Sequence, residues 1–271
     1  MESHYLKYPH STFHYRQYGN GAKLLFCFHG YGRDGNTFYF FERLLGNQYT
    51  VIAIDLPFHG YTEWDKELTF HPNYLIQVIQ QIRTSLKKDK EKFSILGFSM
   101  GGRIALYLTQ VLYKHIERLV LIAPDGLRFS FWNFIAVHTW LGNKLLNYTI
   151  NNPAWFLKLL DFVERAKVVS RSITSFVHYY MDDKQQRLIL YRRWTTMRMF
   201  KPRTSKLTRL INKHKIKVRM MFGRYDNIIP ATGGKKFCKH IEKNAALKIV
   251  DLGHNLLNEG NARRIAELFN D

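Results

Sequence analysis

The sequence predicts an α/β fold, with a mainly parallel, doubly wound β-sheet and an inserted helical cap. Short apolar runs of strand length alternate with segments whose apolar residues recur at helical spacing, which is the pattern of β-α-β units. Candidate functional side chains stand at or just past the ends of such runs, where parallel sheets bind ligands: His29, Asp55, Ser99 and Asp125. After Pro124 the strand pattern stops until Lys217, which predicts the insertion.

The chain of 271 residues is long enough for one large α/β domain or two small domains. Its N-terminus lacks the apolar core of a signal peptide, and no stretch has the length and hydrophobicity of a membrane-spanning helix. Cys27 lies in an apolar run and Cys238 in a helical pattern, so we expect buried free thiols rather than a disulfide. These features predict a cytoplasmic protein.

The charge balance is strongly basic, with 41 lysines and arginines against 21 aspartates and glutamates and a formal net charge of +20. One interpretation is an anionic partner, such as an acidic substrate, a membrane surface or a nucleic acid. The other is a set of solvated lysine-rich faces, which the lack of any block of five basic residues favours. Nucleic-acid binding has no motif in its support beyond net charge, and we do not expect it.

Strands and helices alternate in the N-terminal part. Thr12–Tyr18 alternates polar and apolar residues, and Lys23–His29 and Thr50–Asp55 are continuous apolar runs typical of buried strands. Asn36–Leu45 and Pro72–Leu86 carry apolar residues at the spacing of an amphipathic helix. We therefore expect the sheet to be established before the central motif of the chain.

That central motif lies in Phe93–Tyr107. Phe93–Phe98 is predicted to be a buried strand, and from Ile104 the apolar residues follow helical spacing. Between them, G-F-S-M-G-G places a serine at the apex of a sharp turn from strand to helix. Such a turn leaves no room for a Cβ atom two residues before or after Ser99, which explains the glycines. The context predicts a nucleophile elbow with Ser99 as the nucleophile.

The insertion follows the next predicted strand, Ile116–Pro124, and is expected to be helical. It holds four of the five tryptophans and about half of the chain's positive excess. Its predicted helices are Trp132–Leu146, Pro153–Phe162, Val163–Val177 and Arg187–Met199. The uncharged segment 129–143 is expected to line the inner face of the cap, or alternatively to lie on a membrane surface.

The regular pattern resumes towards the C-terminus. Val218–Gly223 is predicted to be a strand, Gly233–Lys243 a helix and Leu247–Leu252 the last strand, before a C-terminal helix. The domain prediction is a first part of the core at residues 1–124, a helical cap or lid at 125–212 and a second part of the core at 213–271.

A serine hydroxyl needs a base to accept its proton and a carboxylate to orient that base. Of the twelve histidines, His254 lies in a Gly-His loop directly after the last predicted strand. For the acid, Asp226 follows a strand in the pattern G-x-x-D-x-x-x-P, and we prefer it to Asp125, from which a carboxylate could reach the same histidine. The predicted catalytic residues are therefore Ser99, Asp226 and His254.

The chain resembles the α/β-hydrolase superfamily over essentially all of its length outside the cap. The resemblance is carried by H-G-Y-G at residues 29–32, G-F-S-M-G-G at 97–102, G-R-Y-D at 223–226 and G-H at 253–254, and by the order serine, acid, histidine. It implies a cap after the sixth strand of the fold and an oxyanion hole formed by the backbone N–H groups of Tyr31 and Met100. Met100 opens a helix, whose N-terminus favours negative charge. His29 would then be a structural residue of its own loop.

One motif departs from the family pattern. After the third strand the family usually has D-x-x-G-H-G, whereas residues 55–60 are D-L-P-F-H-G, with Phe58 in place of the first glycine. The departure leaves the triad intact and concerns the path of this loop and any pocket that it lines. Phe58 and Arg103, directly behind the elbow, are the candidate substrate contacts.

The motifs leave three functions open. The first is a serine hydrolase that cleaves a carboxylic ester, a thioester or a related carbonyl compound through an acyl-enzyme; a serine at the elbow makes the alkyl-enzyme chemistry of dehalogenases and epoxide hydrolases implausible. The second is a lyase, because G-F-S-M-G-G-R-I-A-L resembles the 2,4-cyclohexadiene-carboxylate synthase of menaquinone biosynthesis, in which arginines hold an acidic substrate. The third is a catalytically idle binding protein with a basic cap.

The partner expected in each case follows from the cap and its charge. We expect a small-molecule substrate with an apolar acyl part, to which the basic residues would add affinity for an anionic group. Weak contact with an anionic membrane surface is a further expectation. No metal-ligand cluster or phosphate-binding loop is present in the sequence, so we expect no metal and no cofactor.

Overall fold

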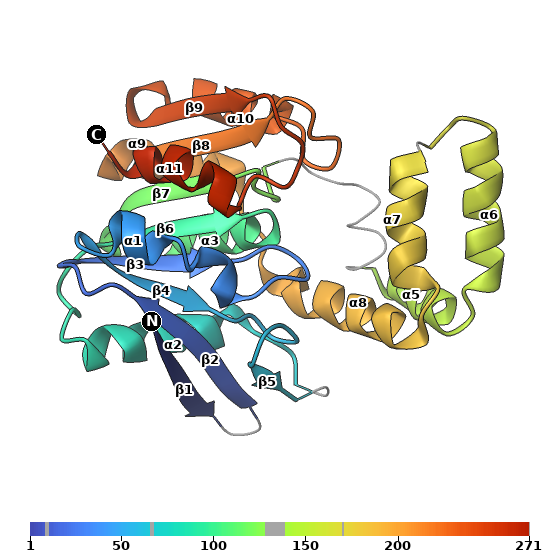
Figure 1. Cartoon of the computed structure of the whole chain (residues 1–271), viewed down its shortest axis with the longest axis horizontal. Helices are drawn as coiled ribbons and strands as arrows, with labels where there is room; N and C mark the ends of the chain where they lie inside the picture. The colour runs from blue at the N-terminus through green and yellow to red at the C-terminus, as the bar shows by residue number, and fades with distance from the viewer. Residues whose placement is uncertain (9–10, 66–67, 128–138, 170, 271) are drawn as a thin grey trace. The chain divides into compact units, whose positions relative to one another are not determined.

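The computed structural model describes residues 1–8, 11–65, 68–127, 139–169 and 171–270. The chain folds into two compact units, one formed by residues 1–128 and 199–271 and the other by residues 129–198. We call the first the sheet unit and the second the helical unit, and describe each by itself (Figure 1).

Within the described residues, the sheet unit has a nine-stranded sheet in the order β1-β2-β4-β3-β6-β7-β8-β9, with the short β5 paired to β2. The pairs β4–β3, β3–β6, β6–β7, β7–β8 and β8–β9 are parallel, and β2 is antiparallel to β1, β4 and β5. The strands are β1 (Glu2–Tyr8), β2 (Ser11–Tyr18), β3 (Lys23–Phe28), β4 (Tyr49–Ile54), β5 (Glu63–Trp64), β6 (Phe93–Phe98), β7 (Ile116–Ile122), β8 (Lys217–Gly223) and β9 (Ala245–Val250). The predicted fold class is confirmed, and the parallel strands end at one common edge.

Helices cover both faces of this sheet, with α1 and α11 on one face and α2 and α3 on the other (Figure 1). The helices of the unit are α1 (Phe41–Leu45), α2 (Pro72–Ser85), α3 (Met100–Leu112), α9 (Thr204–His214), α10 (Thr232–Lys239) and α11 (Ala262–Ala266). Side chains alternate between the two faces of each strand. Leu25 and Cys27 of β3 accordingly pack in one core cluster with Phe41 of α1 and Ile265 of α11.

Several elements of this unit differ from the sequence prediction, and β5 and α9 are among those that were not predicted. The strand β1 was not predicted, because its polar and charged residues are largely exposed at the edge of the sheet. The single helix predicted over Asn36–Leu45 is wrong: a 3-10 turn at Gly35–Phe38 precedes α1. The break lets Phe38, Phe40 and Phe41 all be buried, which one continuous helical face does not allow. The helix predicted over Gly233–Lys243 ends at Lys239 and is followed by a 3-10 turn at Glu242–Asn244.

The helical unit contains α5 (Trp140–Asn151), α6 (Ala154–Arg165), α7 (Arg171–Met181) and α8 (Lys184–Thr196). One buried guanidinium joins three of them. Arg187 of α8 donates to the carbonyl oxygens of Ile150 at 2.9 Å and of Met181 at 2.6 Å, which lie near the ends of α5 and α7. Unpaired carbonyls at helix C-termini need such a donor, so Arg187 ties the unit together.

The helix boundaries in this unit differ from the prediction. The expected division between Phe162 and Val163 is wrong, because α6 continues to Arg165. It ends in a Schellman motif with Lys167 at a φ of +57°, where the N–H of Lys167 donates to Glu164 and that of Val168 to Val163. Residues 132–138 of the first predicted helix lie outside the described residues, as does most of the uncharged segment 129–143.

The predicted cap, residues 125–212, is longer than the helical unit, residues 129–198. Helix α9 lies within the predicted cap range but belongs to the sheet unit. The backbone N–H of Arg203, just before α9, donates to Gln110 of α3 at 2.8 Å. The boundaries of a cap domain therefore stay a prediction.

Two features bear on the compartment of the protein. Cys27 is buried and Cys238 is half-buried, and both are free thiols. Burial raises the pKa of both thiols, which keeps them protonated and unreactive. Within the described part of the chain, no helix combines the length and the apolar character that crossing a bilayer requires.

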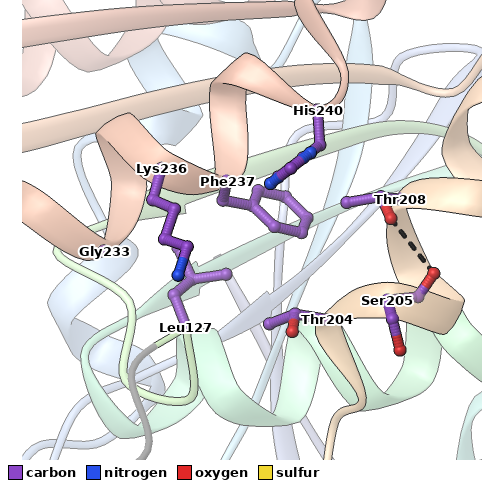
Figure 2. Close-up of a pocket in the computed structure, with 8 residues that line it drawn as sticks. All are labelled: Leu127, Thr204, Ser205, Thr208, Gly233, Lys236, Phe237 and His240. Atoms are coloured by element: carbon purple, nitrogen blue, oxygen red, sulfur yellow. Dashed lines mark hydrogen bonds between the residues drawn. The ribbon is translucent and has the colours of Figure 1, made fainter.

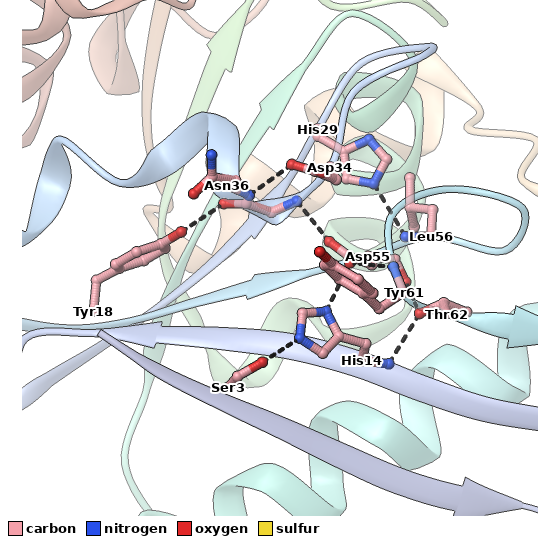
Figure 3. A network of polar contacts seen from close by, with 11 residues as sticks. Ser3, His14, Tyr18, His29, Asp34, Asn36, Asp55, Leu56, Tyr61 and Thr62 are labelled. Atoms are coloured by element: carbon pink, nitrogen blue, oxygen red, sulfur yellow. Dashed lines mark hydrogen bonds and ion pairs between the residues drawn. The ribbon is translucent and has the colours of Figure 1, made fainter.

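A buried carboxylate at the end of β4 holds three segments of the sheet unit together (Figure 3). Asp55 accepts hydrogen bonds from the backbone N–H of Gly35 at 2.6 Å, from that of Tyr61 at 2.9 Å and from Nδ1 of His14 at 2.7 Å. Asp55 and His14 are both fully buried. The other ring nitrogen of His14 lies 2.6 Å from the hydroxyl of Ser3 in β1. Burial by itself raises the pKa of Asp55, but the hydrogen bonds from His14, Tyr61 and Gly35 outweigh it and leave the pKa below its ordinary value.

We expect Asp55→Ala to lower the free energy of unfolding at neutral pH by about 3–5 kcal/mol, because one partly buried and two buried donors lose their acceptor. Since the pKa of Asp55 is depressed in the folded state, its contribution is complete above about pH 4 and is lost as the pH falls through the folded-state pKa. Urea unfolding followed at pH 7 and at acidic pH measures both effects. The matched control is Asp251→Ala, which removes an exposed ion pair with Arg224 and should cost less than about 1 kcal/mol. Equal losses in the two variants would contradict the assignment.

Candidate active site

Ser99 lies at the turn from β6 to α3, in a strained backbone conformation. Its φ is +51° and its ψ is −116°, a region that costs a non-glycine residue about 1–3 kcal/mol. A Cβ atom at Gly97 would lie 2.4 Å from the carbonyl oxygen of Gly101, and one at Gly101 would lie 2.0 Å from that of Phe28. Only glycine fits at either position, so the two glycines permit the turn that presents Ser99.

His254 follows β9 and lies between the serine and a carboxylate. Its Nε2 lies 3.0 Å from the hydroxyl oxygen of Ser99, and its Nδ1 lies 2.7 Å from Oδ2 of Asp226. Asp226 and His254 follow the neighbouring parallel strands β8 and β9, so both reach the same sheet edge as Ser99. The structure thus brings together the three residues predicted from distant parts of the sequence.

The carboxylate of Asp226 is held so that one of its two oxygens faces His254. The side chain is buried, and its Oδ1 accepts the backbone N–H groups of Ile228 at 2.9 Å and Ile229 at 2.8 Å. Its Oδ2 faces His254. An ionised carboxylate only accepts hydrogen bonds, so Nδ1 of His254 carries the proton, and Nε2 of the neutral ring accepts from the Ser99 hydroxyl. That tautomer allows the ring to take the serine proton.

Asp125 and Arg103, two other residues singled out from the sequence, form an ion pair with each other. The backbone N–H of Asp125 donates to the carbonyl of Ser99 at 2.9 Å, so this residue adjoins the elbow through its main chain. Its carboxylate, however, contacts Arg103, whereas that of Asp226 contacts His254. Arg103, predicted as a substrate contact, therefore pairs with Asp125 in this structure.

The predicted oxyanion residues lie on the two segments that flank Ser99. Met100 is the first residue of α3, and Tyr31 follows Gly30, where an added Cβ would lie 3.4 Å from the Cβ of Ser99. His29 holds this loop in place, because its Nδ1 lies 2.8 Å from the carbonyl oxygen of Gly30 and its Nε2 accepts the N–H of Leu56 at 3.1 Å. The backbone beside Ser99 is therefore fixed from both sides.

Phe58 adopts a left-handed backbone conformation, which favours glycine. Its φ is +63°, and that of Gly60 is +53°. At Gly60 a Cβ would lie 1.9 Å from the Asp55 carboxylate, so this second glycine is required. Next to Phe58, the ring of His59 packs 4.9 Å from that of His29. The loop that carries Phe58 therefore lies beside the predicted oxyanion loop.

Two residues near the site were missed in the sequence. Arg33 donates to Oδ1 of Asn255 at 2.6 Å, which links the loop after β3 to the loop of His254. The guanidinium carbon of Arg33 also lies 5.9 Å from the ring of Phe98, and that ring lies 5.4 Å from the ring of His254. Arg33 directly follows the motif H-G-Y-G, and Asn255 directly follows G-H. Their positions next to identified motifs could have indicated that they lie near the site.

Metal binding needs several ligands at one place. Among the residues that the structure describes, no three or more histidine, cysteine, aspartate or glutamate side chains are grouped so that they could hold a metal ion. Asp55 and Asp226, the two buried carboxylates at the strand ends, each accept hydrogen bonds from a histidine and from two backbone N–H groups.

Comparison with known proteins identifies the family. The family model described as the alpha/beta hydrolase fold matches residues 23–260. The chain belongs to this family. The solved structure of a thermophilic esterase from Thermogutta terrifontis matches it with a TM-score of 0.67 at 13% sequence identity, over 96% of this chain and 92% of the other. At that identity the likeness shows the fold.

Three curated relatives represent different activities. A serine hydrolase-like protein of Danio rerio is 31% identical over 107 residues, which span 39% of this chain and 32% of that protein. The monoacylglycerol lipase ABHD6 of Bos taurus is 22% identical over 281 residues, which span 100% of this chain and 82% of the lipase. A Haemophilus influenzae protein with the name 2-succinyl-6-hydroxy-2,4-cyclohexadiene-1-carboxylate synthase is 41% identical over 70 residues, or 26% of each chain.

Proposed function

We propose that the protein is a serine hydrolase that cleaves a carboxylic ester, a thioester or a related carbonyl substrate through an acyl-enzyme. The observation that carries the proposal is the hydrogen-bonded line from the Ser99 hydroxyl through His254 to Asp226, at 3.0 Å and 2.7 Å. Both are hydrogen-bond distances: the first lets the serine proton pass to His254, and the second lets Asp226 orient the ring. The strained backbone of Ser99 supports the proposal, because residues held in such sparsely populated conformations cluster at functional sites.

In the first half of the reaction, the Ser99 oxygen attacks the substrate carbonyl carbon as Nε2 of His254 takes the hydroxyl proton. The carbonyl oxygen gains a negative charge, which the backbone N–H groups of Tyr31 and Met100 stabilise. The imidazolium is stabilised by the Asp226 carboxylate and gives its proton to the leaving alcohol or thiol as the C–O or C–S bond breaks. Ser99 is then esterified.

In the second half, His254 takes a proton from water, and the resulting hydroxide attacks the acyl carbon. The bond to Ser99 breaks, the serine oxygen recovers its proton from His254, and the carboxylic acid leaves. Each step uses only the three side chains, the two backbone donors and water. No redox partner is required.

For the substrate, we propose a small molecule with an apolar acyl part. The helical unit, which we assign to the predicted cap, supports this: Trp140, Leu141 and Phe162 are each at least 68% exposed within it. Exposed apolar side chains in such number indicate a surface that binds apolar groups. The likeness to a monoacylglycerol lipase points in the same direction. The basic residues of the same unit would add affinity for an anionic group, and for an anionic membrane surface.

A lyase reaction on an acidic substrate is the second candidate, favoured by the 41% identity over 70 residues to the Haemophilus influenzae synthase. It would use the same serine and histidine. The position of Arg103 argues against the lyase, because its guanidinium already pairs with Asp125 and would have to leave that partner to bind substrate. Binding without catalysis is the third candidate, which the intact hydrogen-bonded line disfavours.

For the compartment, we propose the cytoplasm. The two thiols are free and their pKa values are raised by burial, which suits a reducing environment.

The proposal predicts that a fluorophosphonate probe labels the wild-type protein at Ser99 and does not label Ser99→Ala. The matched control is Ser3→Ala, because Ser3 also lies 2.6 Å from a histidine paired with a buried aspartate but has no elbow and no helix N-terminus beside it. Peptide mass spectrometry locates the label, which Ser3→Ala should retain in full. A wild-type and a Ser99→Ala protein labelled to the same extent would refute the proposal.

A panel of short- and medium-chain nitrophenyl esters separates the three candidates. Turnover of the esters supports the hydrolase. Labelling of Ser99 without turnover of any ester favours the lyase, because the nucleophile is then activated but acyl transfer is not its reaction. Absence of both labelling and turnover favours binding without catalysis.

A further inference from the structure

A cavity of about 320 Å³ lies in the sheet unit between α9 and α10, and none of the candidate catalytic residues lines it (Figure 2). Its walls differ in chemistry. Helix α10 contributes Lys236 and His240, and helix α9 contributes the hydroxyl side chains of Thr204, Ser205 and Thr208. Figure 2 shows the basic side chains and the hydroxyls on opposite sides, with Phe237 between them. No carboxylate lines the cavity within the described residues.

The segment that supplies the cavity's lining residues other than Leu127 is strongly basic. Between Met199 and Ile241, the chain has twelve lysines and arginines and a single acidic residue, Asp226. The carboxylate of Asp226 is buried and bonded to His254 and two backbone N–H groups, so its charge is already engaged. A cavity in such surroundings attracts an anion and repels a cation.

Both walls of the cavity are held in place. The side chain of Asn212 in α9 donates to the carbonyl of His240 at 2.8 Å, which fixes the ends of the two helices against each other. Gly234 of α10 lies so close to the sheet that a Cβ there would lie 2.3 Å from the ring of Phe222. Phe237 is only 3% exposed. A preformed cavity loses less free energy on binding than a surface that must be ordered.

We propose that this cavity binds a phosphate group. Lys236 supplies a positive charge, His240 a ring N–H, and Thr204 and Ser205 hydroxyl donors, which together match the several oxygens of a tetrahedral anion. Thr208 contributes an acceptor instead, because its hydroxyl donates to the carbonyl of Ser205 at 3.0 Å. It would therefore receive a hydrogen bond from a hydroxyl of the ligand or of a protonated phosphate.

The start of α9 adds to this donor set. Arg203, at the N-cap position, makes no side-chain hydrogen bond to the first turn of the helix. The N–H groups of a first turn have no partner within the helix, and the helix dipole favours an anion there. A carboxylate would be a poorer match, because its planar pair of oxygens is best bound by arginine, and no arginine lines the described cavity.

The volume indicates the size of the ligand. About 320 Å³ is at the lower end of the range for small-molecule sites, so the cavity accommodates a phosphate with a small organic substituent. Such a group is found in a free phosphate ester and in a phospholipid headgroup. The two sources share the same recognition chemistry and are distinguished by experiment.

The test compares Lys236→Ala with Lys235→Ala. Both remove one exposed lysine from the same helix, but only Lys236 lines the cavity. We expect inorganic phosphate and glycerol 1-phosphate to bind the wild-type protein in calorimetric titrations, and Lys236→Ala to weaken binding at least about tenfold. Lys235→Ala should change it less than about threefold. Ser205→Ala, which removes a hydroxyl donor without changing the charge, should weaken binding severalfold.

Vesicles identify the source of the phosphate. Phosphatidylcholine vesicles with and without phosphatidic acid are sedimented with the same variants. Co-sedimentation that depends on phosphatidic acid and on Lys236, but not on Lys235, identifies a lipid headgroup. Binding of the soluble phosphates alone, with the same dependence, identifies a free ester. Equal losses in Lys235→Ala and Lys236→Ala, or no binding of either kind, would overturn the proposal. Ser99→Ala should bind phosphate like the wild type, so the result does not depend on the proposed catalytic function.

Discussion

Ser99→Ala is expected to lower kcat/KM for an ester substrate by about a millionfold, to the residual rate given by substrate binding and the oxyanion donors alone. The hydroxyl at 3.0 Å from His254 is the only nucleophile in the hydrogen-bonded line, and alanine leaves nothing for the histidine to activate. His254→Ala should cause a loss of similar size, because a serine without a base is a poor nucleophile at neutral pH. Steady-state turnover of a nitrophenyl ester measures both losses.

The double variant discriminates a shared mechanism from two independent defects. If the two residues act as one unit, Ser99→Ala combined with His254→Ala is no slower than either single variant. If they acted independently, the losses would multiply. Circular dichroism and thermal unfolding provide the control for folding. Removing the strained serine side chain should leave the melting temperature nearly unchanged, because alanine must adopt the same positive φ. A Ser99→Ala protein that keeps more than about a hundredth of the activity would contradict the assignment.

The elbow and the histidine could be predicted because each depends on a local constraint that the sequence records. Gly97 and Gly101 have backbone neighbours where a Cβ would lie, at 2.4 Å and 2.0 Å, so no other residue fits and the motif is visible. His254 was found from its place after the last predicted strand. Because parallel strands end at one edge of the sheet, residues that directly follow different strands are expected to lie close together.

Helix ends leave a weak signal in this sequence, because three of them lack the glycine that usually marks the end of a helix. Lys87, Lys167 and Lys215 each follow a helix with a φ between +52° and +57°, where glycine is the usual residue. The backbone hydrogen bonds of the Schellman type are present at Lys87 and Lys167, but the glycine that signals them is not. The boundary between the second and third predicted helices of the insertion was therefore misplaced. At Phe58, likewise, a positive φ is held by the surroundings rather than by the residue type.

The choice between Asp226 and Asp125 depended on spacing in the sequence, whereas the structure offers a physical reason. Both follow strands, and Asp125 even donates its N–H to Ser99. What separates them is the partner of each carboxylate: Arg103 for Asp125 and His254 for Asp226. Side-chain pairing of this kind depends on three-dimensional neighbours, which spacing along one chain does not reveal.

Asp226→Asn is expected to lower kcat/KM by about ten-thousandfold while leaving the fold intact. The two backbone N–H groups of Ile228 and Ile229 require an acceptor at the position of Oδ1, so the amide oxygen of asparagine must occupy it. The amide NH₂ is then directed at Nδ1 of His254 and donates to it. The imidazole is forced into the opposite tautomer, with its proton on Nε2 facing Ser99, where it cannot accept the serine proton.

Asp125→Asn is the matched control, because it removes the carboxylate charge from the other candidate acid without contacting His254. We expect its kcat/KM to stay within about threefold of the wild-type value, with a loss of at most about 1 kcal/mol in unfolding free energy from the weakened pair with Arg103. The rate of fluorophosphonate labelling gives a second readout, which should fall with Asp226→Asn and not with Asp125→Asn. A reversed order, with Asp125→Asn the more damaging variant for labelling and turnover, would assign the acid to Asp125 and remove Asp226 from the mechanism.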